Sequence, residues 1–231
     1  MELSIDTSTR FASVAISRRG ETVAELTWRS ERNHSVELVP AIRELTARAG
    51  IEIRGLEAIF IARGPGGFSA LRVGMSTAKA MAASLAIPLV AVGTLDLEVA
   101  PYLGLGYPVC GVIGAGRTRV YVGGYGVGED PKYDVVNTEE FLSTVQPDHL
   151  YCGEGVHELA SELRQRLGDG LLVADVPPPT RRAGAMAAMA YHKLQAGDVE
   201  DALTSEPLYL RSSQVNMANK TWSKTDISGR C

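Results

Sequence analysis

The sequence predicts an α/β protein in which two halves loosely repeat one order of strands and helices. Apolar runs of strand length end in polar or glycine-rich loops twice within the first 75 residues, at Asp6-Thr7-Ser8-Thr9 and at Gly64-Pro65-Gly66-Gly67. Because α/β proteins keep their ligands at the rim where strands end, this pair of loops suggests a nucleotide-related fold.

The first half is predicted to contain three antiparallel strands followed by strand and helix units. Alternating or β-branched residues predict the strands, and spacings of three and four residues predict the helices. The expected strands lie around Leu3 and Ile5 and at 11–17, 22–28, 58–62 and 88–92. The expected helices run from Ser35 to Gly50, over 69–85 and over 94–102, and Pro40 must fall early in the first of them or kink it.

The segment 104–108 is the best candidate for a boundary between lobes, since it combines glycine with proline. We therefore expect a first lobe over 1–104, a smaller second lobe over 105–210 and a polar tail over 211–231. The second lobe should contain strands at 109–113, 119–125, 133–136 and 149–152, and helices from Thr138, over 156–167 and over 183–195. The last helix could pack back on the first lobe. The tail lacks apolar periodicity and is expected to be mobile or ordered by a partner.

Composition excludes several classes of protein. A hydrophobic content of 45% is enough to form a core. A net charge of −4 argues against a protein that binds the phosphate backbone of a nucleic acid through its own surface. Three widely spaced cysteines form neither a disulfide framework nor a CxxC pair, which fits a reducing cytoplasm. No apolar run approaches the roughly 20 residues of a membrane helix, so no membrane association is expected.

Both loops are candidates for binding a nucleotide or phosphate. Asp6, Thr7, Ser8 and Thr9 offer a carboxylate and three hydroxyls, which suit Mg²⁺ and phosphate oxygens. The alternative is an Asx or Ser/Thr turn that only starts a hairpin.

The glycine loop allows close approach of an anion to backbone amides ahead of a helix. Its candidates are Gly64, Gly66, Gly67 and Ser69. It matches neither a Walker A loop nor GxGxxG, so a tight turn in which glycines serve only packing is an equal alternative.

Other residues favour no catalytic or metal site. The four histidines have no HxxxH or HExxH spacing, and no Gly-x-Ser-x-Gly elbow occurs. Arg117 and Arg119 near Tyr121 could bind an anion or form an ordinary solvated strand edge. The helix after the glycine loop is rich in small residues and could approach another helix closely, either inside its own lobe or across a contact with a second copy.

Taken in order, these segments resemble the bacterial TsaB (YeaZ) family over about the first 100 residues. The segments are Ile5-Asp6-Thr7-Ser8-Thr9, His34-Ser35-Val36-Glu37, Arg63-Gly64-Pro65-Gly66-Gly67-Phe68-Ser69 and Leu71-Arg72-Val73-Gly74. The second half is similar more loosely, through Val120-Tyr121 and Glu206-Pro207-Leu208-Tyr209-Leu210-Arg211. Gly114-Ala115-Gly116-Arg117 stands where the family has Asp-Ala-Arg, which puts the role of that acidic position in doubt.

The resemblance implies an actin-like ATPase (ASKHA) fold with two ribonuclease-H-like lobes and mixed sheets. It also implies a cytoplasmic, non-catalytic subunit in the synthesis of threonylcarbamoyladenosine beside the anticodon of tRNA. In that family TsaD transfers threonylcarbamoyl from its adenylate, TsaE hydrolyses ATP, and RNA is reached only through the complex. No cofactor is required, with ATP or ADP and Mg²⁺ as candidates at the lobe or complex interface, and no metal site is expected in this chain.

The resemblance also implies that the two helices of the first lobe pair with TsaD, or with a second copy when TsaD is absent. Carried over by residue, the interface consists of Leu38, Ile42, Leu45, Leu71, Gly74, Met75, Ala78 and Met81. Ala78→Arg is accordingly expected to abolish pairing and leave the monomer folded.

Three other functions remain as alternatives. A self-sufficient actin-like kinase would need a second Asp-x-Gly phosphate loop and a general base, and Gly114-Ala115-Gly116 lacks the acid. A nucleotide-responsive regulator would bind ATP or ADP at Asp6 to Thr9 or between the lobes. A peptidase would require a metal or an activated nucleophile and is the remotest alternative.

Overall fold

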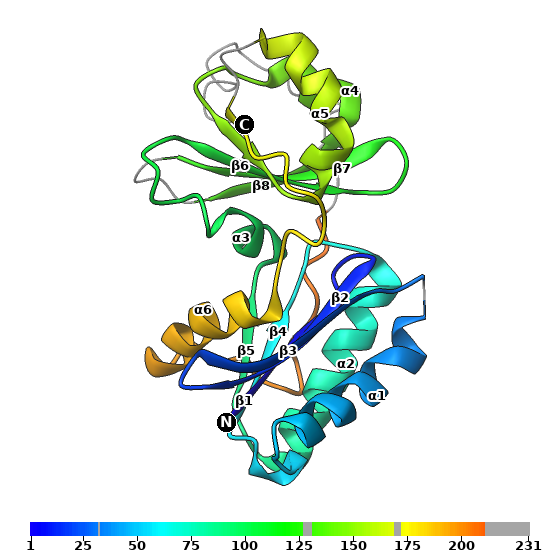
Figure 1. The fold of residues 1–231 in the computed structure, drawn as a ribbon, viewed down its shortest axis with the longest axis vertical. Coiled ribbons are helices and arrows are strands. Elements are labelled where there is room, and N and C mark those ends of the chain that lie inside the picture. The colour runs from blue at the N-terminus through cyan, green and yellow to red at the C-terminus, as the bar shows by residue number, and fades with distance from the viewer. Residues whose placement is uncertain (32, 127–130, 169–171, 211–231) are drawn as a thin grey trace. The chain divides into compact units, whose positions relative to one another are not determined.

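The computed structural model describes residues 1–31, 33–126, 131–168 and 172–210, which form two compact units (Figure 1). Unit 1 consists of Met1–Leu97 and Arg181–Tyr209, and unit 2 of Glu98–Thr180 with Leu210. The expected tail over 211–231 lies outside the described residues.

Unit 1 is built on a five-stranded mixed sheet in the order β3-β2-β1-β4-β5. Strands β1, β2 and β3 are antiparallel neighbours, whereas β4 and β5 run parallel to β1. The bounds are β1 Glu2–Asp6, β2 Phe11–Arg18, β3 Glu21–Arg29, β4 Ala58–Ala62 and β5 Leu89–Val92. This arrangement brings the carboxyl ends of β1, β4 and β5 to one edge of the sheet, where the two loops follow.

Helices cover both faces of this sheet (Figure 1). Helices α1 (His34–Arg48) and α2 (Phe68–Leu85) pack on one face, and α6 (Ala183–Gln195) packs on the other. In β4, Ile59 and Ile61 join the core under α1 and α2, while Phe60 joins the core under α6. Because alternate residues of a strand point to opposite faces, a strand buried on both sides needs the continuous apolar run that β4 has.

Unit 2 repeats the same strand order, as β8-β7-β6-β9-β10. Its strands are β6 Val109–Gly114, β7 Arg119–Tyr125, β8 Lys132–Asn137, β9 Leu150–Cys152 and β10 Leu172–Val173. Helices α4 (Thr138–Thr144) and α5 (Glu154–Leu167) belong to this unit, and α5 packs on the sheet through Val156 and Leu163. The α/β class with two mixed sheets is therefore confirmed.

The division of the chain differs from the expected lobes 1–104 and 105–210. Helix α3 (Thr94–Val99) ends before 102, and Val99 and Tyr102 pack with strand residues of unit 2, so the division falls after Leu97. The segment Arg181–Tyr209 returns to unit 1 because Met186 and other α6 residues complete the core on the second face of the sheet.

Two local features complete the description of unit 1. Pro40 lies well inside α1, beyond its first turn, and the short 3-10 helix η1 (Ile53–Gly55) precedes β4.

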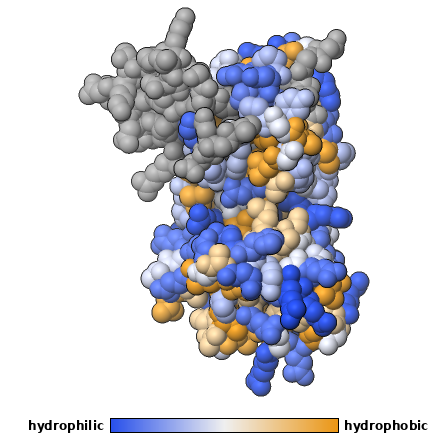
Figure 2. Space-filling view, turned by 90° about the vertical axis from the view of Figure 1, so that its left-hand side faces the viewer, coloured by the Kyte–Doolittle hydropathy of each residue, from blue (hydrophilic) through white to orange (hydrophobic). Residues whose placement is uncertain are grey.

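None of the helices that the structure describes is long and apolar enough to cross a membrane. Figure 2 shows the side that carries α6 in unit 1, where hydrophilic residues break up the hydrophobic ones.

Candidate functional site

The two predicted loops of unit 1 lie together at the carboxyl edge of the sheet. The Gly67 amide donates to the Ser8 carbonyl oxygen at 2.7 Å, and the Thr7 hydroxyl donates to the Ala70 carbonyl oxygen at 2.8 Å. Gly66 lies so close that a Cβ atom there would come within 2.2 Å of the Ser8 oxygen. Only glycine fits this approach, so the loops are fastened to each other through backbone.

The polar side chains after β1 are bound inside the unit. Asp6 accepts a hydrogen bond from the Ser8 amide at 2.8 Å, and its other oxygen pairs with the Arg181 guanidinium at 3.0 Å. Arg181 also donates to the Thr9 hydroxyl at 2.9 Å, and the Ser8 and Thr94 hydroxyls lie 2.8 Å apart. An Mg²⁺ ion that bound Asp6 directly would compete with Arg181 for the carboxylate.

Arg181 is a site residue that the sequence interpretation did not identify. It is 175 positions from its partner Asp6, and the side chains of both are only 2% exposed. Burial of a charge is costly unless the charge is paired, so this arginine specifically requires the carboxylate of Asp6. The signal in the sequence was an arginine two residues before an alanine-rich helix, which does not indicate the partner.

The glycine loop is positioned by two other segments. The Gly64 carbonyl accepts from the Thr94 amide at 2.9 Å, and the Arg63 carbonyl accepts from the Leu208 amide at 2.7 Å. Gly64 has a φ of +108°, which explains the need for glycine. Of the predicted loop candidates, Asp6, Thr7, Ser8, Gly64 and Gly66 are buried and Thr9 is half-buried, whereas Gly67 and Ser69 are exposed.

Helix α1 begins in contact with the same edge. His34 Nε2 lies 2.9 Å from the Thr9 carbonyl oxygen, which can only accept, so this nitrogen carries a proton. Glu37 in the first turn receives the Trp28 indole N–H at 3.0 Å. Hydrogen bonds from Ser30 and Trp28 hold the pKa of Glu37 below its ordinary value. The motif His34-Ser35-Val36-Glu37 therefore anchors α1 to the loop after β1 and to β3.

The side chains predicted to form the pairing interface lie in the core of unit 1, which corrects that prediction at the level of residues. All but Met81 are buried, and Ala78 is 0% exposed. Most of them pack in one cluster with Ile5, Ile59 and other residues of the sheet, because the apolar stripe of each helix faces its own sheet; these are Leu38, Ile42, Leu45, Met75, Ala78 and Met81. Ala78→Arg would place a charge in this core, so the expectation of a folded monomer is wrong.

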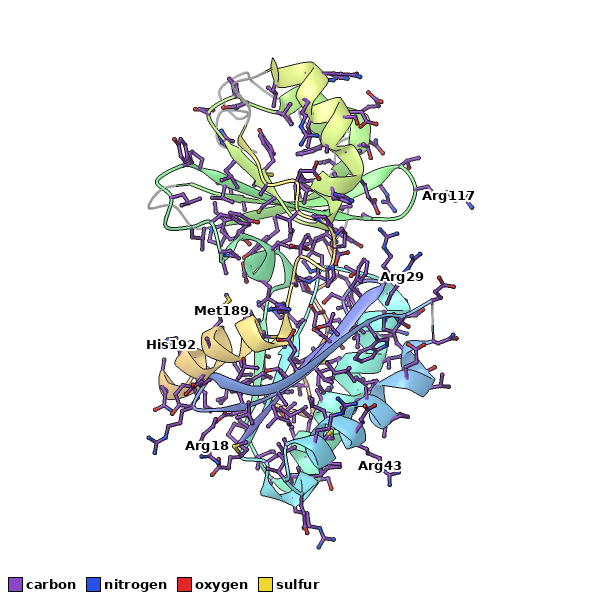
Figure 3. The ribbon with its side chains drawn as sticks, in the orientation of Figure 1. Arg18, Arg29, Arg43, Arg117, Met189 and His192 are labelled. Carbon is purple, nitrogen blue, oxygen red and sulfur yellow. The ribbon has the colours of Figure 1, made fainter. Side chains whose placement is uncertain are left out.

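An exposed groove lies beside that stripe. It is open between α1 and α2, with mostly apolar walls and Arg43 extending from α1 away from the sheet (Figure 3). We call it the α1–α2 groove, and its lining residues are Val39, Ile42, Arg43, Ile53, Ser76, Thr77, Ala80 and Met81. Val39 is 49% exposed, so the two predicted helices do present an apolar surface, formed by Ile42 and Met81 of the predicted set together with neighbouring residues.

In unit 2, Gly114 ends β6, Ala115 and Gly116 lie in the turn that leads to β7, and Arg117 extends outward from that turn (Figure 3). A Cβ atom at position 114 would lie 3.7 Å from Glu158 Oε2 on α5. A carboxylate therefore stands next to the position that is acidic in the family. Burial raises the pKa of the nearby Tyr121 above its ordinary value, against the opposing effect of Arg119. Within the described residues, no group of three or more His, Cys, Asp and Glu is arranged to hold a metal ion.

Comparison with known sequences gives two kinds of relative. Residues 24–165 match the family model described as TsaD, tRNA N6-adenosine threonylcarbamoyltransferase. The chain is 27% identical to the tRNA threonylcarbamoyladenosine biosynthesis protein TsaB of Haemophilus influenzae, over 96% of this chain and 95% of that one. It is 33% identical to TsaB of Bacillus subtilis over 53% of this chain, a match that spans about half of the relative's length.

Comparison with solved structures also finds YeaZ proteins. YeaZ from Pseudomonas aeruginosa superposes with a TM-score of 0.73 at 26% identity, over 90% of this chain and 99% of that chain. A structure described as similar to peptidase YEAZ, from the same organism, gives a TM-score of 0.75 at 25% identity over 91% and 99%. The activator of 2-hydroxyisocaproyl-CoA dehydratase from Clostridium difficile gives 0.52 at 12% identity over 87% and 98%, a likeness in fold alone. The fold is that of the actin-like ATPases.

Proposed function

Because the chain belongs to the family matched by the TsaD model, and within it to the TsaB (YeaZ) group, we propose that it acts in the biosynthesis of threonylcarbamoyladenosine in tRNA. Its role there is that of a non-catalytic subunit that pairs with TsaD and enables the transfer that TsaD performs. TsaE is the second partner, and a homodimer forms when TsaD is absent. The complex acts in the cytoplasm.

The observation that carries this proposal is the α1–α2 groove. Val39 of α1 and Met81 of α2 offer apolar side chains at the surface of two helices that already pack against each other, and Ile53 of η1 lines the groove beside them. Ser76 and Ala80 on α2 are small, so a partner helix could approach the backbone closely. An exposed apolar surface that is rimmed by polar groups is typical of a protein–protein contact.

The loop after β1 supports a non-catalytic role. Its carboxylate and hydroxyls are engaged by Arg181, Ala70 and Thr94, so binding of a metal–nucleotide complex would break a buried ion pair. We propose that the isolated chain needs no cofactor. ATP or ADP with Mg²⁺, if used, binds at an interface completed by the partner.

The proposal is tested by reconstituting tRNA modification. The assay contains the cognate TsaD and TsaE, the enzyme that makes threonylcarbamoyl-adenylate, ATP, threonine and bicarbonate, with or without this chain. Light scattering of the chain with TsaD reports the mass of the complex. Modification and a one-to-one complex are both expected to depend on the chain, and independence of both would refute the role.

Two substitutions of alanine by arginine test whether the α1–α2 groove is the contact with TsaD. Ala80→Arg places a long charged side chain in the groove and is expected to lower the complex mass to that of free subunits. Ala185→Arg makes the same change at an exposed position on α6, outside the groove, and should leave the complex intact. An intact complex with Ala80→Arg would place the contact elsewhere on the molecule.

A further inference from the structure

The exposed face of α1 carries apolar side chains next to an arginine. Val36 is 68% exposed and Val39 is 49% exposed, and Arg43 follows at a spacing that keeps it on the same side of the helix. Val39 and Arg43 both line the α1–α2 groove. Figure 3 shows the Arg43 side chain extending away from the sheet. A partner on this face of α1 would therefore meet two valines and a guanidinium group.

The exposed face of α2 carries a second arginine. Arg72, Ser76 and Ala80 are each exposed and lie four residues apart, so they follow one another along the same side of the helix. Ser76 and Ala80 line the α1–α2 groove, and Arg72 lies one turn before Ser76. The surface that begins in the groove thus continues along α2 to Arg72.

Two aromatic residues hold the Arg72 guanidinium in place. Its central carbon lies 4.1 Å from the centroid of the Phe68 ring, and its Nε donates to the Tyr209 hydroxyl at 3.2 Å. The rings of Phe68 and Tyr209 have centroids 5.1 Å apart. The two terminal nitrogens of Arg72 form no hydrogen bond with the described residues. A guanidinium group that is already fixed in position loses less conformational entropy when it binds a carboxylate.

Neither Arg43 nor Arg72 forms an ion pair with any residue that the structure describes. In contrast, Arg48 near the end of α1 pairs with Glu44 at 2.6 Å, and α2 contains no acidic residue. Arginine binds carboxylates through paired N–H donors. The two helices therefore present an apolar surface with one available guanidinium group on each helix. Such a surface is complementary to an apolar protein surface that carries carboxylates at its margin.

We propose that the surface of TsaD that occupies the α1–α2 groove carries two carboxylates, and that their ion pairs with Arg43 and Arg72 favour pairing with TsaD over pairing with a second copy of this chain. A second copy bound through the same groove would bring the arginines of both copies together. The acidic residues of α1, Glu37 and Glu44, are already bonded to Trp28 and Arg48. Charges left without partners penalise the wrong complex. The inference rests on the proposed pairing with TsaD and adds the chemistry that selects this partner.

The test measures two dissociation constants by analytical ultracentrifugation, one for the full chain with its cognate TsaD and one for self-association of the full chain. Arg43→Glu and Arg72→Glu are each expected to raise the Kd for TsaD about tenfold, because like charges then face each other. The Kd for self-association should stay the same or fall. Added salt should weaken the wild-type complex with TsaD more than the complex of the double variant.

Arg18→Glu is the matched control for these charge reversals. Arg18 is an exposed arginine at the end of β2, outside both helices (Figure 3). The substitution should change either Kd by less than about twofold. Melting temperatures equal to that of the wild type establish that each variant is folded, which is expected because all three arginines are exposed.

A chemical cross-link identifies the carboxylates of the partner. Arg43→Lys and Arg72→Lys keep the positive charge and introduce a primary amine. A carbodiimide then joins this amine to a carboxylate within ion-pair distance as an amide, and the reagent takes up the water as a urea. Mass spectrometry should find peptides containing position 43 or 72 joined to Asp or Glu of TsaD. Arg18→Lys should give no cross-link to TsaD.

Several results would overturn the inference. These are unchanged affinity for TsaD in both Arg43→Glu and Arg72→Glu, cross-links from positions 43 and 72 to the same chain alone, and an equal loss of TsaD binding and self-association. The proposed function is tested separately by the wild-type chain. If that chain forms no complex with TsaD and tRNA modification does not depend on it, the proposed function fails. A complex that forms as tightly without the two arginines refutes only the present inference.

Discussion

At the end of β1, one buried ion pair holds the first loop to the start of α6. Asp6 and Arg181 have side chains that are each 2% exposed, and they are 3.0 Å apart. Arg181→Ala would leave the carboxylate buried without its partner, which typically costs about 3–5 kcal/mol. We expect the free energy of unfolding of unit 1 to fall by this amount, measured by urea denaturation.

The neighbouring arginine provides the control. Arg182 has a side chain that is 75% exposed and lies 3.7 Å from Glu25, so Arg182→Ala should change the free energy by less than about 1 kcal/mol. Equal effects of the two substitutions would mean that the buried pair contributes nothing beyond an exposed one.

Glu37 makes the stability of the start of α1 depend on pH. Its pKa is lowered in the folded protein, so the stabilisation is complete above the ordinary value of 4.5 and is lost as pH falls through the folded pKa. Glu37→Gln should therefore reduce the free energy of unfolding at pH 7, by less than about 1 kcal/mol, and have no effect near the acid end of the titration. Denaturation at a series of pH values measures the difference.

The indole donor supplies an independent check of that result. In a Trp28→Phe background the hydrogen bond at 3.0 Å is gone, so the pH-dependent difference should shrink. A difference that keeps its full size in this background would assign the effect to other groups.

At the scale of elements, α2 has a buried face and an exposed face that differ by only a few positions. Ala78 is 0% exposed in the core under the sheet, whereas Ala80 is exposed and lines the α1–α2 groove. Ala78→Arg is expected to unfold unit 1 because it buries an unpaired charge. Ala80→Arg is expected to keep the wild-type circular dichroism spectrum and melting temperature, since arginine is a good helix former.

The comparison of these two substitutions separates folding from pairing. Loss of complex mass by a folded Ala80→Arg protein assigns the effect to the surface. A melting temperature of Ala78→Arg equal to that of the wild type would contradict the burial of this position.

At the scale of the whole molecule, each hydrophobic cluster lies within one of the two units. One set gathers residues of unit 1, and the other gathers residues of unit 2. Calorimetric unfolding is therefore expected to need two components. Leu45→Ala should lower the midpoint of one and Leu163→Ala that of the other, each by several degrees, because truncating a buried leucine costs about 2–5 kcal/mol.

Two outcomes for these leucine variants would contradict independent unfolding of the units. If either substitution lowers both midpoints equally, or if a single component fits the scan, the two cores unfold as one cooperative unit.

Local pattern in the sequence determined the strands, the helices and their order. The apolar run of β4, the glycine loop and the periodicity of α2 each depend on residues close together in the chain, so their types and approximate bounds were predictable. The repeat of one strand order in both units followed from the repeated order of elements. The motifs around Asp6, His34 and Gly64 were sufficient to indicate the family.

Tertiary structure decided which of those residues are buried and which groups they contact. Leu38, Leu71 and Met75 were predicted at an interface because periodicity identifies an apolar face but does not say whether a sheet of the same chain or a partner covers it. Asp6 is a ligand candidate by its place at the end of β1, and only the structure shows that Arg181, 175 residues away, pairs with it. The sequence by itself determined local structure and family, because these depend on neighbours along the chain; burial and partnership depend on contacts across the fold, which only the tertiary structure contains.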